Sequence, residues 1–201
     1  MANIEPILYL DTNIVLDVLH SRWPASKELF ERIKSERWKC ITSRFTMPEL
    51  LDIEHEECFI ENKKAEGHPL SRIRTLLGTR HQKAHALPRR DLEKIHALLD
   101  SHNEDIFAYI EFQFPVANSF WDKAEDYCNS TEIAVADAMH LALAQESGCN
   151  ILVTRDSDFR ALADDFIIST SPEGIETALA KLNKQTGGEE IWQVKKAANT
   201  K

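Results

Sequence analysis

Short apolar runs alternate with longer amphipathic segments through the first 65 residues of the chain. The run Ile7-Leu8-Tyr9-Leu10 predicts a strand near 7–10, and a second apolar run predicts a strand near 39–42. Helices are predicted for the segments between and after these runs, near 13–20, 24–37 and 46–64. Pro24 and Pro48 fall in the first turns of the last two helices, where an amide has no helical partner. Strands that alternate with helices indicate a parallel sheet covered by helices.

The middle of the chain keeps a helical periodicity but has no comparable strand pattern. Gly67-His68-Pro69 ends the third helix, and two further helices are predicted near 70–84 and 89–102. We interpret residues 66–115 as a helical insertion that ends at Pro115.

The alternation of strand and helix returns after residue 116. The predicted elements are helices near 117–128 and 133–147, strands near 150–153 and 166–168, and a helix after Ser171-Pro172. We therefore expect an α/β protein of three layers, with a central parallel sheet, helices on both faces and the helical insertion. Residues 1–185 would form this one domain, and residues 186–201 a polar C-terminal tail.

The bulk composition narrows the classes of function. With 201 residues, 43% of them hydrophobic, the chain can bury one substantial core. Its net charge of −9 argues against a protein that binds DNA over a large basic surface, so any contact with nucleic acid must be local. The four cysteines form no C-x-x-C pair and the N-terminus lacks a secretory pattern, so we expect reduced thiols and a cytoplasmic protein. No apolar stretch approaches the roughly 20 residues that span a bilayer, which argues against a membrane role.

Carboxylates follow the predicted strands. Asp11 comes directly after the first apolar run, and Asp156 comes soon after the run at 151–153. Both are therefore expected at the carboxyl edge of the sheet, where α/β proteins bind ligands. Mg²⁺ and Mn²⁺ prefer hard oxygen ligands, and hydrolysis of a phosphodiester needs an activated water and neutralised phosphate charge. Several converging carboxylates meet that demand, which indicates a metal-dependent nuclease.

Each acid has a structural interpretation when it is taken alone. Asp11 is also suited to cap the next helix. Glu49 and Asp137 are also suited to the first turn of a helix, where the dipole favours negative charge. Asp156 and Asp158 are also suited to forming turns.

The position of Asp137 favours the metal hypothesis. It shares a helical face with Ile133, His140 and Leu141, so its side chain should point towards the sheet. A carboxylate in that position needs a partner, because an unpaired buried charge is costly, and one cation neutralises several acids. His140 is expected to pack or hydrogen-bond beside the ligands, or to be an ordinary half-buried helix histidine.

Four motifs in a fixed order carry a family resemblance. They are D-T-N-I after the first strand, a glutamate early in the helix after the second strand, D-A-x-H-L-A, and T-R-D-x-D-F. This set resembles the PIN domain, especially the VapC-type toxin ribonucleases of bacterial toxin–antitoxin pairs. The resemblance covers residues 5–65 and 116–180, and the stretch 66–115 is longer than in a compact member.

The resemblance implies roles for individual residues. The catalytic, metal-binding acids would be Asp11, Glu49, Asp137 and Asp156, with Asp158 as a further ligand. Asn13 would position Asp11 or a metal-bound water, and Thr154 and His140 would support the ligands through hydrogen bonds.

We therefore expect an endoribonuclease that hydrolyses RNA phosphodiester bonds with Mg²⁺ or Mn²⁺ and acts as the toxin of a type II toxin–antitoxin pair. Its partners would be RNA, an antitoxin that inserts an arginine among the carboxylates, and a second copy in a homodimer. The alternatives are an RNA-processing PIN nuclease without a toxin role and a non-catalytic regulatory or RNA-binding module. A haloacid-dehalogenase-like phosphatase is disfavoured, because it would have a second aspartate where Asn13 stands.

The predicted insertion contains a basic stretch. Residues 72–94 hold seven basic and two acidic residues, a net charge of +5. The residues expected to contact RNA phosphates are Arg72, Arg74, Arg89 and Arg90. The alternative is two solvated helix faces of mixed charge. His81 and His85 are expected to be exposed rather than to bind zinc, and the four dispersed tryptophans are expected in the core or at an interface.

Overall fold

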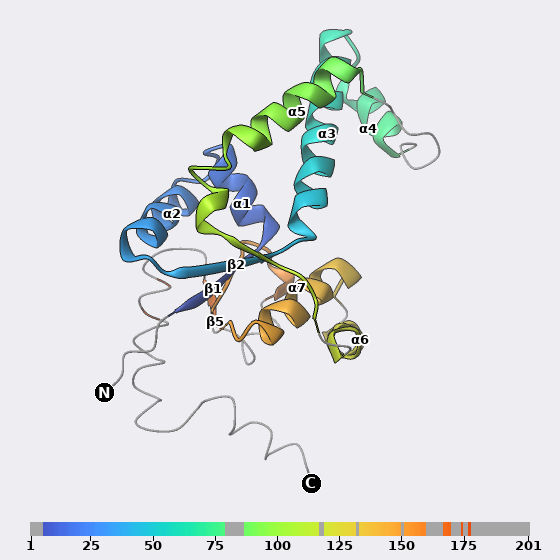
Figure 1. Cartoon of the computed structure of the whole chain (residues 1–201). Coiled ribbons are helices and arrows are strands. Elements are labelled where there is room, and N and C mark those ends of the chain that lie inside the picture. Colours follow the sequence, from blue (N-terminus) through green and yellow to red (C-terminus); the bar gives the residue numbers. More distant parts are fainter. Residues whose placement is uncertain are drawn as a thin grey trace, which may run out of the picture. The chain divides into compact units, whose positions relative to one another are not determined.

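The computed structural model, drawn in Figure 1, describes residues 6–78, 87–116, 119–131, 133–149, 151–159 and 167–169, together with Gly174 and Thr177. The chain divides into two compact units. Met1–Ser43 and Tyr109–Lys201 form the first, which we call the sheet unit. Arg44–Ala108 form the second, which we call the helical unit.

The sheet unit contains a parallel sheet of five strands in the order β3-β2-β1-β4-β5. The strands are β1 (Ile7–Leu10), β2 (Lys39–Ser43), β3 (Glu111–Gln113), β4 (Ile151–Val153) and β5 (Ile167–Ser169). The central strand β1 pairs with β2 and β4, and Leu8 lies opposite both Cys40 and Ile151. Leu8, Tyr9 and Leu10 are almost fully buried, as expected for a parallel strand covered on both faces.

Two pairs of helices connect these strands. Between β1 and β2 lie α1 (Thr12–Leu19) and α2 (Pro24–Glu36), and between β3 and β4 lie α6 (Ser119–Thr131) and α7 (Val135–Glu146). The first connection leads from β1 to β2, its neighbour on one side. The second leads from β3 back across the sheet to β4, on the other side of β1. Since parallel crossovers are right-handed, the two pairs cover opposite faces, as Figure 1 shows. The three-layer α/β fold predicted from the sequence is confirmed.

Small side chains let α7 lie close to the sheet. Ala138, Ala142 and Ala144 are fully buried, and α7 contacts β2. The four cysteines are free thiols. Burial raises the pKa of the Cys149 thiol to about 12, and it raises that of Cys40 even further above its ordinary value. Both thiols are therefore protonated at neutral pH and contribute to the core as apolar groups.

Strand β3 is an element that the sequence analysis did not predict. It lies within the segment interpreted as wholly helical, after a 3₁₀ turn η2 (Phe107–Tyr109), and pairs with β2 so that Glu111 lies opposite Ile41. Three residues are too few to show the alternation of a strand. Their extended conformation depends on the hydrogen bonds that β2 offers at the edge of the sheet.

The other predicted elements agree with the structure within a few residues wherever it describes them. The helix predicted for 70–84 is described as far as Gly78. Of the helix predicted after Ser171-Pro172, the structure describes Gly174 and Thr177, and both are helical. The predictions for the tail 186–201 and for His81 and His85 lie outside the described residues. Across the part of the chain that the structure describes, no helix is long and apolar enough to cross a membrane.

In its described part, the helical unit contains α3 (Thr46–Ala65), α4 (Leu70–Gly78) and α5 (Arg89–Ser101). Both α4 and α5 pack against α3. Its buried apolar side chains include Phe59, Ile73, Leu87, Ile95 and Leu99.

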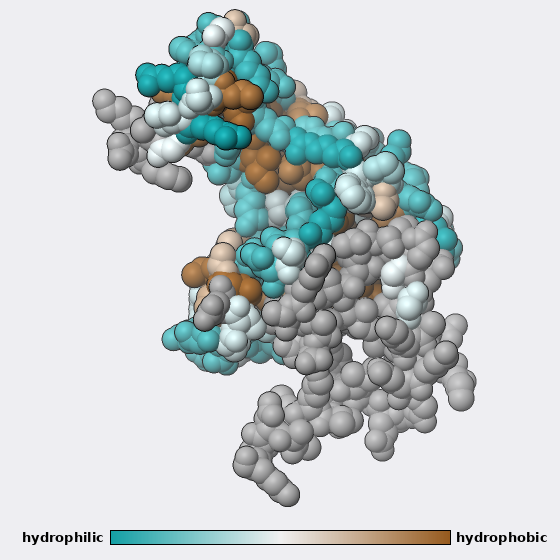
Figure 2. All heavy atoms as spheres, turned by 180° about the vertical axis from the view of Figure 1, so that it is seen from behind, coloured by the Kyte–Doolittle hydropathy of each residue, from teal (hydrophilic) through white to brown (hydrophobic). Residues whose placement is uncertain are grey.

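Figure 2 shows one face of the protein, where the described surface is mainly hydrophilic and apolar side chains gather in small patches.

A buried carboxylate connects α5 to α3. Asp91, in the first turn of α5, is 1% exposed. It accepts hydrogen bonds from Asn62 Nδ2 on α3 and from Lys94 Nζ, each at 3.0 Å. These two bonds, that of Asn62 first, lower the pKa of the Asp91 carboxyl below its ordinary value. The charged form is therefore the one that the folded helical unit stabilises.

Replacing this carboxylate should destabilise the helical unit. We expect Asp91→Asn to lower the urea midpoint of unfolding at pH 7, because the amide loses the charge that Asn62 and Lys94 stabilise. A carboxyl whose pKa is lowered by folding contributes stability above its unfolded pKa of about 3.9 and loses it as the pH falls through the folded pKa. The gap between wild type and variant should thus be full at pH 7 and shrink below about pH 4. Glu93→Gln, which changes an exposed acid of the same helix, is the control, and an equal effect of both substitutions would contradict the prediction.

Candidate metal centre

The carboxyl end of β1 is held from both sides. The backbone N–H of Asp11 donates to the carbonyl of Val153 in β4 at 3.0 Å. On the other side, Thr42 Oγ1 of β2 donates to the carbonyl of Leu10 at 2.7 Å. Asp11 is thus placed at the point where the chain order changes direction, between β1 and β4. Open α/β sheets bind their ligands at such switch points.

The carboxylate of Asp11 is buried, and hydrogen bonds from neighbouring donors orient it. Asp11 is 7% exposed and is the N-cap of α1, where Oδ1 accepts the Thr12 N–H at 2.7 Å. Its Oδ2 accepts from Asn13 Nδ2 and from Thr154 Oγ1, both at 2.6 Å. These donors hold the carboxylate in one direction. The capping interpretation of Asp11 is therefore correct, and it is compatible with a role as a ligand.

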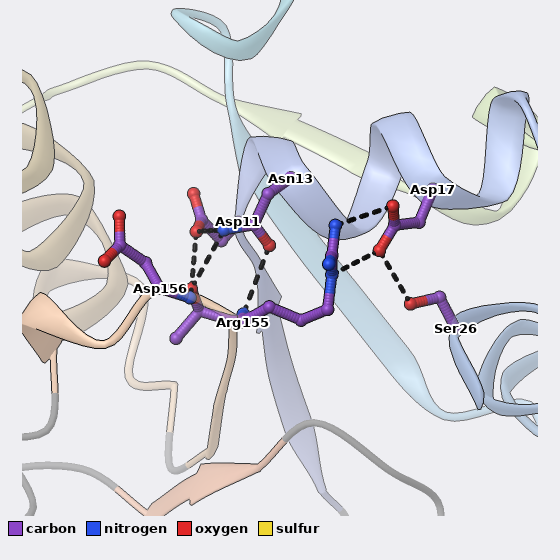
Figure 3. A network of polar contacts seen from close by, with 7 residues as sticks. Asp11, Asn13, Asp17, Ser26, Arg155 and Asp156 are labelled. Carbon is purple, nitrogen blue, oxygen red and sulfur yellow. Dashed lines mark hydrogen bonds and ion pairs between the residues drawn. The ribbon is translucent and has the colours of Figure 1, made fainter. Parts of the chain in front are cut away.

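The loop after β4 is joined to the same group of side chains (Figure 3). Thr154 Oγ1 accepts the N–H of Asp156 at 2.9 Å, and Asn13 Oδ1 accepts the N–H of Arg155 at 3.2 Å. Asp156 Oδ1 in turn accepts the N–H of Asp158 at 2.9 Å, which is the turn-forming interaction expected of an aspartate here. The structure thus brings Asp11, Asn13, Thr154 and Asp156 together, with Asp156 half-buried and Asp158 exposed.

Asp137 lies in the first turn of α7 and is half-buried. One turn later, His140 is 2% exposed and its Nδ1 lies 2.7 Å from the hydroxyl of Tyr9, with the two rings edge to face. Tyr9 is two residues before Asp11 on β1. Because α7 returns the chain towards the amino end of β4, its first turn lies towards the carboxyl edge of the sheet. The contact between His140 and Tyr9 therefore fastens the helix that carries Asp137 to the strand that carries Asp11.

Glu49 and the basic residues belong to the helical unit. Glu49 is half-buried in the first turn of α3, where its N–H donates to the carbonyl of Phe45. Arg72 and Arg74 are exposed on α4. On α5, Arg89 pairs with Glu93 at 2.8 Å and Arg90 with Asp91 at 3.6 Å, which is the mixed-charge pattern of a solvated face. The predicted roles of Glu49 and of the four arginines remain predictions.

The sequence analysis did not predict a second group of polar side chains, formed by Asp17, Ser26 and Arg155. This group lies beside the one around Asp11. Arg155 Nη2 donates to Asp17 Oδ1 at 2.8 Å, and Arg155 Nε lies 2.5 Å from Asp17 Oδ2. Ser26 Oγ donates to the same Oδ2 at 3.2 Å, and the guanidinium lies 5.1 Å from the centroid of Trp23. Asp17 is 1% exposed, whereas Trp23, which was expected in the core or at an interface, is 45% exposed in this chain. The sequence shows an aspartate, Asp17, within the apolar run of α1, but it does not show which residue pairs with it.

The residues at this edge fit a hard divalent cation. The donors that the sheet unit offers there are carboxylate oxygens, which are the ligands that Mg²⁺ and Mn²⁺ prefer. Figure 3 shows that the side chains of Arg155 and Asp156 point in opposite directions, so the guanidinium is turned to Asp17 and not to the Asp156 carboxylate.

Comparison with known proteins identifies the family. The model of the PIN domain matches residues 8–165, and the chain belongs to this family. Proteins of the family are generally nucleases. No significant match is found among curated proteins.

Two solved structures are similar in fold. A toxin–antitoxin complex from Klebsiella pneumoniae is 17% identical, with a TM-score of 0.47, over 81% of this chain and 96% of that one. VapBC2 from Rickettsia felis, bound to a DNA fragment from its promoter, is 13% identical, with a TM-score of 0.51, over 81% of this chain and 97% of that one. At 13% identity, the likeness to VapBC2 concerns the fold alone.

The contact between β1 and α7 can be tested by removing one hydroxyl. We expect Tyr9→Phe to lower the free energy of unfolding by about 1–3 kcal/mol, because the buried His140 Nδ1 loses its hydrogen-bond partner. Tyr109→Phe is the matched control, since Tyr109 is 46% exposed in the same unit. Chemical denaturation of both variants measures the difference, and equal stabilities would show that this hydrogen bond does not hold α7.

Proposed function

We propose that this PIN-domain protein is a Mg²⁺- or Mn²⁺-dependent endoribonuclease whose site lies at the carboxyl edge of β1 and β4. The observation that supports the proposal most strongly is the hydrogen-bonded group of Asp11, Asn13, Thr154 and Asp156. Segments far apart in the sequence orient acidic side chains there, and a hard cation is the ligand that such an arrangement suits.

Each of the candidate site residues has a defined task in this proposal. The motif order proposes Asp11, Glu49, Asp137 and Asp156 as the metal ligands, with Asp158 as a further ligand. Asn13 and Thr154 hold Asp11 in one orientation through their bonds to Oδ2. When bound, the metal would supply an activated water and neutralise charge on the phosphate. His140 keeps α7 against β1 and so sets the position of Asp137.

RNA is the proposed substrate, and its contacts must be local because the chain is acidic overall. The exposed arginines of the helical unit, Arg72, Arg74, Arg89 and Arg90, would contact its phosphates. Arg89 and Arg90 would have to exchange their present ion pairs for phosphate contacts, so Arg72 and Arg74 are the stronger candidates.

A role as a toxin follows from the motif order and is supported by the shared fold with VapBC2. An active nuclease must be restrained in its own cell, so we propose a small antitoxin as partner, with an arginine that enters among the carboxylates. Large apolar side chains exposed on the sheet unit offer surface for a protein partner, whether antitoxin or second copy. They include Phe114, Val116, Trp121 and Val135.

Cleavage of single-stranded RNA tests the nuclease directly. The purified protein should cleave labelled RNA with Mg²⁺ or Mn²⁺ and stop when the metal is chelated. We expect Asp137→Asn to lose at least about 100-fold in rate, because even the hydrogen-bond partners of metal ligands are typically worth 10–100-fold. Asp122→Asn is the matched control, since Asp122 is also a first-turn helix acid but is exposed on α6. Equal cleavage by Asp137→Asn and wild type at the same metal concentration would refute the assignment.

Expression in bacteria tests the toxin role separately. Induction of the wild-type chain should arrest growth, whereas Asp11→Asn at equal soluble level should be tolerated, because the loss of one ligand charge weakens metal binding. Co-expression of the small protein encoded beside this chain should restore growth, and the two should purify together. Normal growth at high soluble expression of wild type would remove the toxin role and favour an RNA-processing nuclease.

A further inference from the structure

The residue between Thr154 and Asp156 is tied to α1 at two points. The backbone N–H of Arg155 donates to Asn13 Oδ1, and its guanidinium binds the carboxylate of Asp17. Asn13 and Asp17 are four residues apart on α1 and therefore lie on the same face of that helix, one turn from each other. Arg155 thus lies along this face, with its main chain at the first turn and its side chain at the next.

The pair formed by Asp17 and Arg155 has the geometry of a specific contact. Two guanidinium nitrogens face the two oxygens of one buried carboxylate, and Ser26 Oγ donates to one of those oxygens as well. A planar, two-point contact allows only one relative orientation. An ion pair with one buried partner, here Asp17, is a weak source of stability, since apolar side chains of the same volume often serve as well. What the pair adds over apolar packing is the orientation of the loop.

The orientation of the loop affects the carboxylate of Asp156, the next residue in the chain. The side chains of Arg155 and Asp156 point in opposite directions from the loop (Figure 3). Holding the guanidinium on α1 therefore keeps the Asp156 carboxylate on the side of Asp11. The ring of Trp23 beside the guanidinium, at 5.1 Å, supports the same side-chain position from α2.

We infer that Arg155 is a positioning residue for the candidate metal centre, and that its contact with buried Asp17 holds the Thr154–Asp156 loop in the geometry that binds the cation. This inference rests on the proposed function, because it assumes that Asp11 and Asp156 bind a divalent cation. Arg155 itself touches neither metal nor substrate in this role. Its effect passes through the hydrogen bonds of the loop to Asn13 and Thr154.

The test compares metal affinity with stability in four variants of the full chain. They are Arg155→Met, Asp17→Asn, the double variant that combines both, and Arg32→Met as control. Arg32 resembles Arg155 in pairing with a carboxylate, that of Glu36, and in lying near a tryptophan, Trp38, in the same unit. Mn²⁺ affinity is measured by electron paramagnetic resonance of the free ion, and Tm by circular dichroism.

We expect Arg155→Met to lower Tm, because it leaves the buried Asp17 carboxylate without its counter-charge, and the double variant to recover Tm. Both should bind Mn²⁺ about 10–100-fold more weakly than wild type, the usual effect of losing a residue that supports metal ligands. Asp17→Asn should also weaken Mn²⁺ binding, and Arg32→Met should leave it unchanged. The decisive variant is the double one, which has no buried unpaired charge but lacks the positioning contact.

The possible failures are distinct. If the double variant binds Mn²⁺ as tightly as wild type, the pair is structural and the inference is wrong, while the metal site stands. If Arg32→Met weakens binding as much as Arg155→Met, the effect is not specific to the loop and the inference is also wrong. If wild type itself binds no Mn²⁺, the proposed metal centre is wrong and this inference falls with it.

Discussion

The hydrogen bonds to the Asp11 carboxylate are the interaction on which the arrangement of the sheet edge depends. Asp11 joins three segments: it continues the pairing of β1 with β4, it caps α1, and its Oδ2 binds Asn13 and Thr154. The hydroxyl oxygen of Thr154 in turn accepts the backbone N–H of Asp156. Burying the carboxylate without these donors would cost free energy, so the burial of Asp11 depends on them.

Among the described residues, each unit has a buried aspartate besides Asp11 that joins neighbouring segments. In the sheet unit, Asp17 connects α1 with α2 through Ser26 and with the loop after β4 through Arg155. In the helical unit, Asp91 connects α5 with α3 through Asn62. Both are buried acids with charged and neutral donors around them, and in both cases the contact specifies direction as well as attraction. Apolar packing supplies most of the burial, and these acids add contacts of defined direction between elements that the fold brings together.

The structural and the functional interpretations of the acids are compatible. Asp11 caps a helix and Asp156 forms a turn, as their alternative interpretations proposed. These same bonds immobilise the carboxylates at the switch point of a PIN-domain sheet. A capping or turn-forming bond occupies part of a carboxylate and fixes its direction, which in the proposed metal centre would preorganise it for the cation.

Strands β1, β2, β4 and β5, most helices, and the edge at which Asp11 and Asp156 lie were contained in local sequence pattern. Apolar runs such as Ile7–Leu10 specify buried parallel strands, and a residue that follows such a strand lies at its carboxyl edge whatever the rest of the chain does. Two features were decided only by the folded chain. Strand β3 is extended because β2 offers it hydrogen bonds, and three residues carry no period of their own. Asp17 and Arg155 are 138 positions apart, and only the neighbouring places of β1 and β4 in the sheet bring α1 beside the loop where they pair.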